Sequence, residues 1–163
     1  MVLVGSIGGK SALTFLDRVM AWRPLQYVAA RIAPWAGTAL AAPFFLASGS
    51  RLDEEARQEA RLSLAVWHER KVWLAANKEQ RILMRDHDRL VALVPTLTVP
   101  AIVVQGTRDL TLPPKAGIEL AKALPNGRLI EIKGGHMLSF EEPVLVAAAV
   151  RDLTSESEAS AAS

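Results

Sequence analysis

Three short apolar runs, each ending within two residues of a glycine, mark the chain at residues 2–4, 101–105 and 129–132. Continuous runs of Val, Ile and Leu are typical of strands buried on both faces of a parallel sheet. Segments of helical character separate the runs, in the order that βαβ units require. The pattern therefore predicts an α/β fold with a partial parallel sheet of about three strands.

A helix is predicted on each side of the third run. Ala116, Leu120 and Leu124 recur at four-residue spacing between proline and Pro-Asn-Gly turn signals, which predicts one crossover helix. A final helix is predicted over residues 143–153. Residues 154–163 contain only Ser, Ala, Glu and Thr, so a disordered tail is expected there.

Residues 12–94, between the first two strands, are far more than one crossover helix needs, so an insertion is predicted there. An apolar stripe within residues 56–67 and a charged segment at 72–93 both have helical spacing. All four tryptophans lie in this insertion. They either pack its helices together or line a pocket for an apolar ligand.

A charge-free stretch at residues 32–50 raises the question of a membrane span. Alanine dominates this stretch, and Pro34 and Pro43 interrupt it. We therefore expect short helices over an apolar pocket and no membrane partner. At the amino terminus an apolar run precedes the first cation, Lys10, which is the wrong order for a secretory signal, so a cytoplasmic protein is expected.

The charge balance excludes a nucleic-acid partner. The 163 residues include 19 Lys and Arg against 17 Asp and Glu, which gives a formal charge of +2. The basic residues are scattered among acids and form no stripe that could follow a phosphate backbone. There is no cysteine, which excludes disulfide scaffolds and thiolate metal sites.

Polar residues that could carry chemistry follow the second and third predicted strands. They are Asp109, in Gly-Thr-Arg-Asp, and His136, in Gly-Gly-His. Because the carboxyl ends of parallel strands lie on one edge of a sheet, an acid and an imidazole placed this way could meet. Alternatively, the aspartate is a turn residue and the histidine a structural one.

Other candidate sites are weaker. His68 and His87 lie among charged residues on predicted helices, so we expect both to be solvated and predict no metal site. Gly9-Lys10-Ser11 follows the first strand like the end of a phosphate-binding loop. However, Val4 stands where that loop has its first glycine, so a tight turn is expected instead.

The carboxyl-terminal part of the chain resembles a known fold. Residues 99–113 and 121–127, then Gly-Gly-His-Met and Glu-Pro, follow the order and spacing of the C-terminal half of the α/β hydrolases, over residues 95–150. Residues 1–5 resemble the strand after the nucleophile helix of that family. The resemblance implies a core of residues 1–11 and 95–153, with residues 12–94 as a helical cap.

The resemblance also implies roles for individual residues. Family enzymes place the acid after the penultimate strand and the histidine after the last, which corresponds to Asp109 and His136. His136 would act as general base and acid, and Asp109 would hold its tautomer and stabilise its protonated form. No cofactor is implied. The substrate is expected to be small and fairly apolar.

Four further residues are expected to line the substrate site. Leu110 and Met137 each follow a residue of the expected pair, and Trp35 and Phe44 lie in the insertion. Ester or related acyl-bond hydrolysis is the expected reaction. Dehalogenation, perhydrolysis and C–C cleavage share the same acid and histidine placement within the family and remain open.

Two parts of the family pattern are missing from the chain. No G-x-S-x-G nucleophile motif occurs, and the loop that supplies oxyanion donors should lie upstream of Met1. Three parallel strands also leave the edge of the first strand unpaired. We therefore expect a truncated hydrolase that is inactive alone. The alternative is a non-catalytic remnant or interaction module that pairs its open edge with another chain or with itself.

Overall fold

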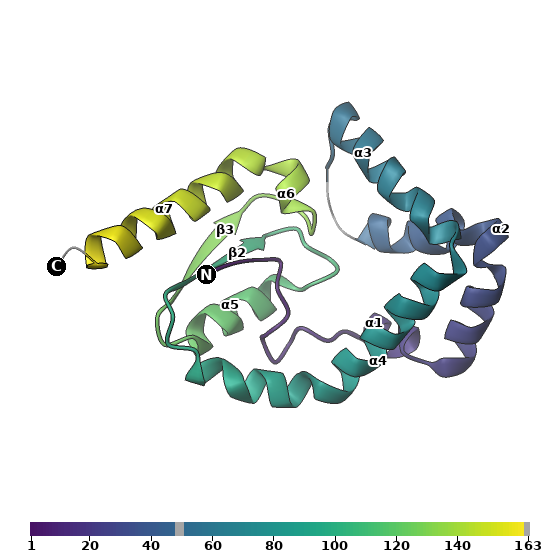
Figure 1. Cartoon of the computed structure of the whole chain (residues 1–163), viewed down its shortest axis with the longest axis horizontal. Helices are drawn as coiled ribbons and strands as arrows, with labels where there is room; N and C mark the ends of the chain where they lie inside the picture. Colours follow the sequence, from purple (N-terminus) through teal and green to yellow (C-terminus); the bar gives the residue numbers. More distant parts are fainter. Residues whose placement is uncertain (48–50, 162–163) are drawn as a thin grey trace.

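A computed structural model describes residues 1–47 and 51–161 of the chain. In chain order the elements are β1 (Val2–Val4), α1 (Phe15–Met20), α2 (Arg23–Ala47), α3 (Glu54–Ala65), η1 (Val66–His68), α4 (Arg70–Leu93), η2 (Val94–Thr96), β2 (Ala101–Gly106), α5 (Pro114–Ala123), β3 (Gly127–Ile132), α6 (Leu138–Glu141) and α7 (Pro143–Ala161). Helices make up most of the insertion between β1 and β2, as expected (Figure 1).

The three predicted strands form one parallel sheet in the order β1-β2-β3. Val4 pairs with Val104, and Gly106 pairs with Ile132, so all three strands end at the same edge. β2 is buried along its whole length because it is the central strand. β1 and β3 are only partly buried, so the expectation of burial on both faces holds for β2 and is wrong for its neighbours.

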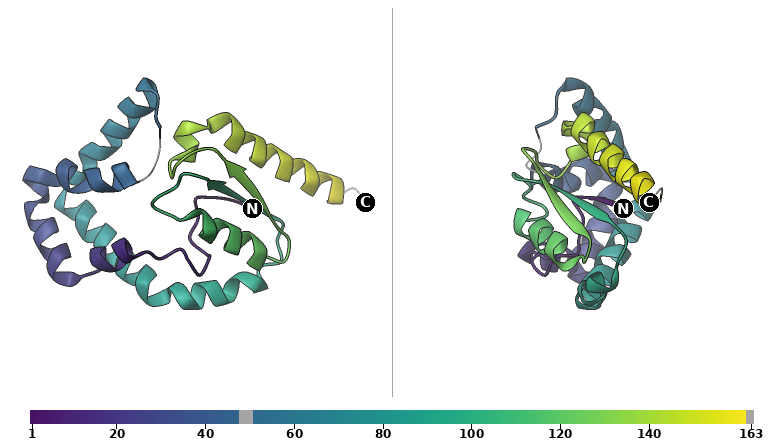
Figure 2. Two further views of the ribbon diagram at one scale, coloured as in Figure 1. Left: turned by 180° about the vertical axis from the view of Figure 1, so that it is seen from behind. Right: turned by 90° about the vertical axis from the view of Figure 1, so that its left-hand side faces the viewer.

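Two helical layers cover the two faces of the sheet (Figure 2). On one face Val103 packs with Leu120 and Leu124 of the α5 segment. On the other face Ile102 and Val104 pack with α7. The alternation of side chains along β2 therefore serves two cores at once. The predicted crossover helix is confirmed as α5.

The expectation of a disordered carboxyl-terminal tail is wrong over residues 154–161. Helix α7 continues through this segment to Ala161. The Thr154 hydroxyl donates to the Arg151 carbonyl over 2.8 Å, and the Ser155 hydroxyl donates to the same oxygen over 3.0 Å. Leu153 is buried in the α7 core, which holds the helix to the sheet beyond its midpoint.

The expectation of short helices after Ile32 is confirmed in part, because a break at Ala36 divides α2 into two helical segments. The backbone at Ala36 is not helical, with φ at −132° and ψ at 17°, so one segment contains Pro34 and the other contains Pro43. A proline removes one helical hydrogen bond, and packing can compensate for that loss. Here Ala29, Ala30 and Ala33 pack against Trp73 of α4. Within the described residues no helix is both long and apolar enough to cross a membrane.

The tryptophans of the insertion divide into two groups. Trp67 and Trp73 lie edge to face with ring centroids 5.1 Å apart, and the Trp73 indole donates to the Trp67 carbonyl. They therefore pack helices, whereas Trp22 and Trp35 are exposed.

His87 is buried on α4, so its expected solvation is wrong. His87 lies on the inward face of α4, whereas the charged residue Asp88 beside it faces water.

Candidate active site

Asp109 lies in the turn that follows β2, and its carboxylate is fixed by backbone amides. Its Oδ1 accepts hydrogen bonds from the amide of Thr111, at 2.9 Å, and from the amide of Leu112, at 2.7 Å. Its side chain is 1% exposed. The amides fix one oxygen in the turn and leave Oδ2 facing the next loop.

Gln105 supports the same carboxylate from within the sheet. Its side chain is fully buried at the end of β2, and Nε2 lies 3.4 Å from Oδ2 of Asp109. The same nitrogen lies 3.3 Å from the carbonyl of Leu112. Sequence reasoning missed this residue. A polar residue inside an otherwise apolar buried strand is the signal that could have identified it.

The loop that carries His136 is bound to the Asp109 loop by backbone hydrogen bonds. The amide of Thr107 donates to Ile132, and the amide of Arg108 donates to Gly134, each over 2.9 Å. The loops approach so closely that a Cβ at Gly106 would lie 2.3 Å from the Gly135 carbonyl oxygen. Glycine is therefore needed at residue 106 for the two loops to meet.

The structure brings Asp109 and His136 together, as the sequence predicts. Nδ1 of His136 lies 2.8 Å from Oδ2 of Asp109. The hydrogen bond to Asp109 raises the pKa of His136 above its ordinary value, burial opposes this, and the negative charge of Asp109 adds to the rise. Because the carboxylate accepts, Nδ1 carries the proton and Nε2 is left as the basic nitrogen.

The open side of the imidazole lies where a reacting group could approach. The His136 side chain is 36% exposed. Within the part of the chain that the structure describes, no hydrogen bond occupies its Nε2. Gly5, at the end of β1 with φ at +50°, lies against the ring, and a Cβ there would be 3.5 Å from Cε1 of His136. All three strand ends thus contribute to this site.

Glu141, in α6, is a buried carboxylate beside the pair that sequence reasoning missed. Its Oε1 accepts from the Gly135 amide at 2.8 Å, and its Oε2 accepts from the Arg51 amide at 3.0 Å. A guanidinium nitrogen of Arg108 lies 3.6 Å from Oε2, and the Glu141 side chain is 3% exposed. It therefore joins the histidine loop, the acid loop and the chain segment that leads into α3.

The structure describes the side chains of three of the four residues expected to line the substrate site. Leu110 is exposed beside Asp109, and Met137 is half-buried beside His136. Trp35 lies on α2 with 80% of its surface exposed, and no hydrogen bond or ring contact joins it to the pair within the described residues. The side chain of Phe44 lies outside what the structure describes.

Gly9-Lys10-Ser11 packs against α5, and Glu119 takes the hydrogen bonds of Ser11. The amide of Ser11 donates to Glu119 over 2.7 Å, and its hydroxyl donates to the same carboxylate over 2.8 Å. A Cβ at Gly9 would lie 2.2 Å from the Ala116 carbonyl oxygen. A phosphate group would need the space and the amide that α5 and Glu119 occupy, so the geometry fits the tight turn.

Comparison with solved structures places the fold in a known architecture. MGS-M2, an α/β hydrolase from a Medee basin deep-sea metagenome library, matches 95% of the chain with a TM-score of 0.66 and 16% identity, over 55% of its own length. A thermophilic esterase from Thermogutta terrifontis matches 95% with a TM-score of 0.60 and 20% identity, over 55% of its length. An enol-lactonase from Burkholderia xenovorans matches 82% with a TM-score of 0.50 and 26% identity, over 50% of its length.

No protein-family model matches the chain, and neither does any curated protein. The chain spans about half the length of the solved structures that it matches. The chain forms a parallel sheet covered by two helical layers, and it superposes on these structures. The chain has part of the α/β-hydrolase fold.

Proposed function

We propose that Asp109 and His136 are the acid and the base of an acyl hydrolase. The observation that carries the proposal is the hydrogen bond of 2.8 Å between Nδ1 of His136 and Oδ2 of Asp109. Two backbone amides fix the other carboxylate oxygen, so the acid is held in place before any substrate binds. A structural histidine needs no such support and no open Nε2.

The proposed chemistry is a double displacement. Nε2 of His136 takes the proton of a nucleophilic hydroxyl as its oxygen bonds to the substrate carbonyl carbon. His136 then gives this proton to the leaving alcohol as the acyl–oxygen bond breaks. In the second half, His136 takes a proton from water as the water oxygen attacks the acyl carbon, and returns it to the nucleophile oxygen as the bond between that oxygen and the acyl carbon breaks. Asp109 stabilises the imidazolium in both halves.

The proposal assigns the nucleophile to a residue outside these 163 residues. No G-x-S-x-G motif occurs in the sequence, and the matched hydrolases are each about twice as long as the part that the chain covers. The donors that stabilise the oxyanion belong to the same external part.

An ester of a small, fairly apolar acid is the proposed substrate class. Two of the similar structures are an esterase and an enol-lactonase, and a lactone is a cyclic ester. Leu110 offers exposed apolar surface directly beside Asp109. Met137, next to His136, adds a flexible apolar side chain, which suits a pocket for acyl chains.

The test compares the 163-residue chain with a form extended at its amino terminus by a segment carrying G-x-S-x-G. The extended form should hydrolyse p-nitrophenyl butyrate, and His136→Ala should lower kcat by about 10³-fold or more. The short chain should show no turnover above its own His136→Ala variant. Turnover of the extended form that survives His136→Ala would overturn the proposal.

The free edge of β1 favours a second candidate, a module that pairs this edge with a second copy of the chain. The Met1 carbonyl and the Gly5 amide bond to β2, so Val2 and Val4 turn their backbone groups to the open edge. Light scattering should then show concentration-dependent dimers, and Val4→Pro should abolish them while sparing the β1–β2 pairing. A monomer at all concentrations would exclude this candidate.

A further inference from the structure

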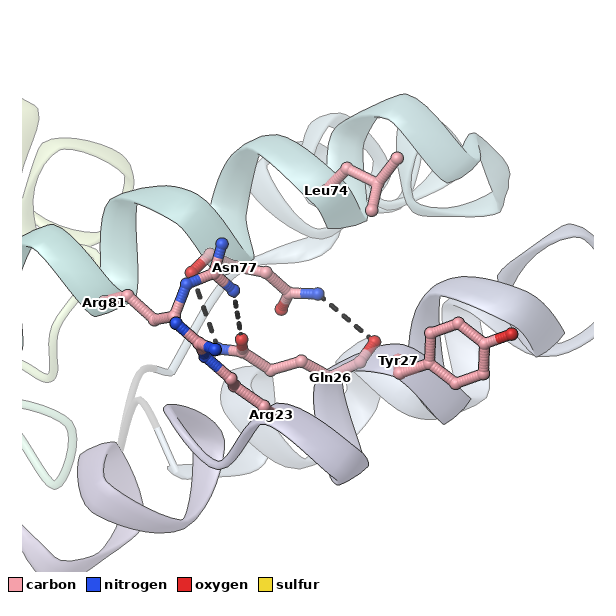
Figure 3. A pocket seen from close by; sticks show the side chains of 6 residues that line it. All are labelled: Arg23, Gln26, Tyr27, Leu74, Asn77 and Arg81. Carbon is pink, nitrogen blue, oxygen red and sulfur yellow. Dashed lines mark hydrogen bonds between the residues drawn. The ribbon is translucent and has the colours of Figure 1, made fainter.

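A cavity of about 310 Å³ lies between the start of α2 and the middle of α4 (Figure 3). Its lining comes from one face of each helix and consists of Arg23, Gln26, Tyr27, Leu74, Asn77 and Arg81. The volume falls at the lower end of the range of small-molecule sites. The Asp109–His136 pair contributes nothing to this lining.

The floor of the cavity consists of two buried side-chain amides that are hydrogen-bonded to backbone carbonyls. The Asn77 side chain donates to the Gln26 carbonyl over 3.3 Å, and the Gln26 side chain donates to the Met20 carbonyl over 2.7 Å. Both side chains are buried. The first bond ties α2 to α4 and the second ties α2 to the end of α1, so the cavity is preformed and costs little ordering when a ligand enters.

The cavity is positively charged at one end. Arg81 donates to the side-chain oxygen of Gln26, which is neutral, so this contact fixes the guanidinium without compensating its charge. Among the described residues the side chain of Arg23 makes no hydrogen bond or ion pair. No carboxylate lines the cavity. Figure 3 shows the guanidinium groups of Arg23 and Arg81 together at the same end.

The start of α2 strengthens this field. Arg23 is the first residue of α2, and the first turn of that helix holds no acidic residue. The amino end of a helix carries a partial positive charge that favours an anion and disfavours a cation. An anion bound between the two arginines would therefore relieve an unfavourable arrangement as well as pair two charges.

The other end of the cavity is apolar. Tyr27 is 67% exposed there, and Leu74 of α4 is also largely exposed. Figure 3 shows both side chains toward the end away from the guanidinium groups. Exposed apolar surface next to a charged recess suits a ligand that has both characters.

We propose that this cavity binds a small organic anion, a carboxylate attached to an apolar or aromatic group. The carboxylate lies between Arg23 and Arg81, which offer the forked donors that match its two oxygens. The apolar group lies over Tyr27 and Leu74. The proposal is independent of the Asp109–His136 chemistry and places a second ligand site in the inserted helices.

The experiment uses benzoate as the probe and the full 163-residue chain. Tyr27 is the single tyrosine of the sequence, so a fluorotyrosine label gives one ¹⁹F resonance that reports on this cavity alone. Titration with benzoate should shift this resonance in a saturable way, with a Kd in or below the millimolar range. Arg23→Gln should weaken binding about tenfold, because it removes a charge-assisted contact. Arg31→Gln, an exposed arginine of α2 outside the cavity lining, should leave the affinity unchanged.

Two further probes separate the parts of the proposal. Benzamide, which has the same shape without the charge, should bind at least tenfold more weakly than benzoate. Inorganic phosphate should also bind more weakly, because it lacks the apolar group. No saturable shift with benzoate, equal affinity of benzamide, or equal affinity of Arg23→Gln and the unmodified chain would overturn the proposal. Phosphate binding as tightly as benzoate would overturn its apolar half.

Discussion

Oε1 of Glu141 accepts a hydrogen bond of 2.8 Å from the amide of Gly135, the residue directly before His136. The bond fixes the backbone from which the imidazole extends toward Asp109. The second oxygen of the same carboxylate accepts a hydrogen bond from the Arg51 amide and lies near the Arg108 guanidinium. The position of His136 therefore depends on a residue that, among the described residues, forms no hydrogen bond with its side chain.

Glu141→Ala should lower the pKa of His136 toward its ordinary value. Without the carboxylate the histidine loop loses its anchor, and the hydrogen bond that raises the pKa weakens. Stability should fall by about 1–3 kcal/mol, because the Gly135 amide and Arg108 lose a buried partner. NMR titration of the three histidine Cε1 protons measures the pKa directly. Glu142→Ala, the next residue along, should leave it unchanged, and an equal effect of both variants would contradict the prediction.

Asp109→Asn should make the free energy of unfolding less dependent on pH in the range where His136 titrates. The folded pKa of His136 is raised, so protonation of His136 stabilises the fold. This contribution is complete below the ordinary histidine pKa of about 6.5 and disappears as the pH rises through the folded value. The destabilisation caused by Asp109→Asn should therefore be larger at acidic than at alkaline pH.

Urea unfolding at several pH values between about 5.5 and 8.5 measures this difference. A part of the destabilisation that comes from the Thr111 and Leu112 amides is independent of pH. In a His136→Gln background the pH-dependent part should vanish. If Asp109→Asn costs the same free energy across the whole window, the pair does not share a proton as described.

The sheet and the pair could be predicted from sequence because their signals are local. Each strand is a short apolar run closed by glycine, and Asp109 and His136 each follow such a run at the same sheet edge. Glu141 could not be found in this way, because it accepts hydrogen bonds from the backbone amides of Gly135 and Arg51, and nearly every residue type presents such an amide. Gln105 does carry a local signal, a polar side chain inside a buried apolar strand, but the signal does not indicate that Asp109 is its partner.

Gly106→Ala should destabilise the protein by about 1–3 kcal/mol or more. The added methyl would lie 2.3 Å from the Gly135 carbonyl oxygen and 2.6 Å from that of Gly134, both backbone atoms. The loops would have to separate, which also moves His136 away from Asp109. Thermal unfolding measures the loss, and the exposed neighbour Thr107→Ala is the matched control. Equal melting temperatures for the two variants would show that the loops have room.

Glu119→Gln should destabilise the contact between α5 and the turn after β1 by about 1 kcal/mol at neutral pH. The hydrogen bond from the Ser11 amide lowers the pKa of Glu119, burial opposes this, and the Ser11 hydroxyl, Lys115 and Lys10 add to the decrease. A lowered folded pKa contributes stability above the ordinary value of about 4.5, which is lost as the pH falls through the folded pKa. The gap between Glu119→Gln and the unmodified chain should therefore close in acid, and a gap that widens would contradict this assignment.

Helix α2 shows why the inserted segment was harder to predict. Proline spacing indicated short helices, and α2 does divide into two segments, but the break lies at Ala36 and each segment contains one of the two prolines. The compensation comes from small residues that let α2 approach Trp73 of α4 closely. Rules based on the local sequence around each proline do not include such contacts between helices, so they could not predict this packing.

Side chains of β2 alternate between two packed faces, so the number of residues in this strand cannot change freely. A single residue inserted in this strand would turn every side chain after it to the opposite face, so Val103 and Val104 would exchange environments. The same insertion would advance the acid by one strand rise, about 3.3 Å, which exceeds the whole separation that joins it to the imidazole. Point substitutions in β2 can be absorbed by repacking, whereas insertions or deletions there would break the core and the chemistry in a single step.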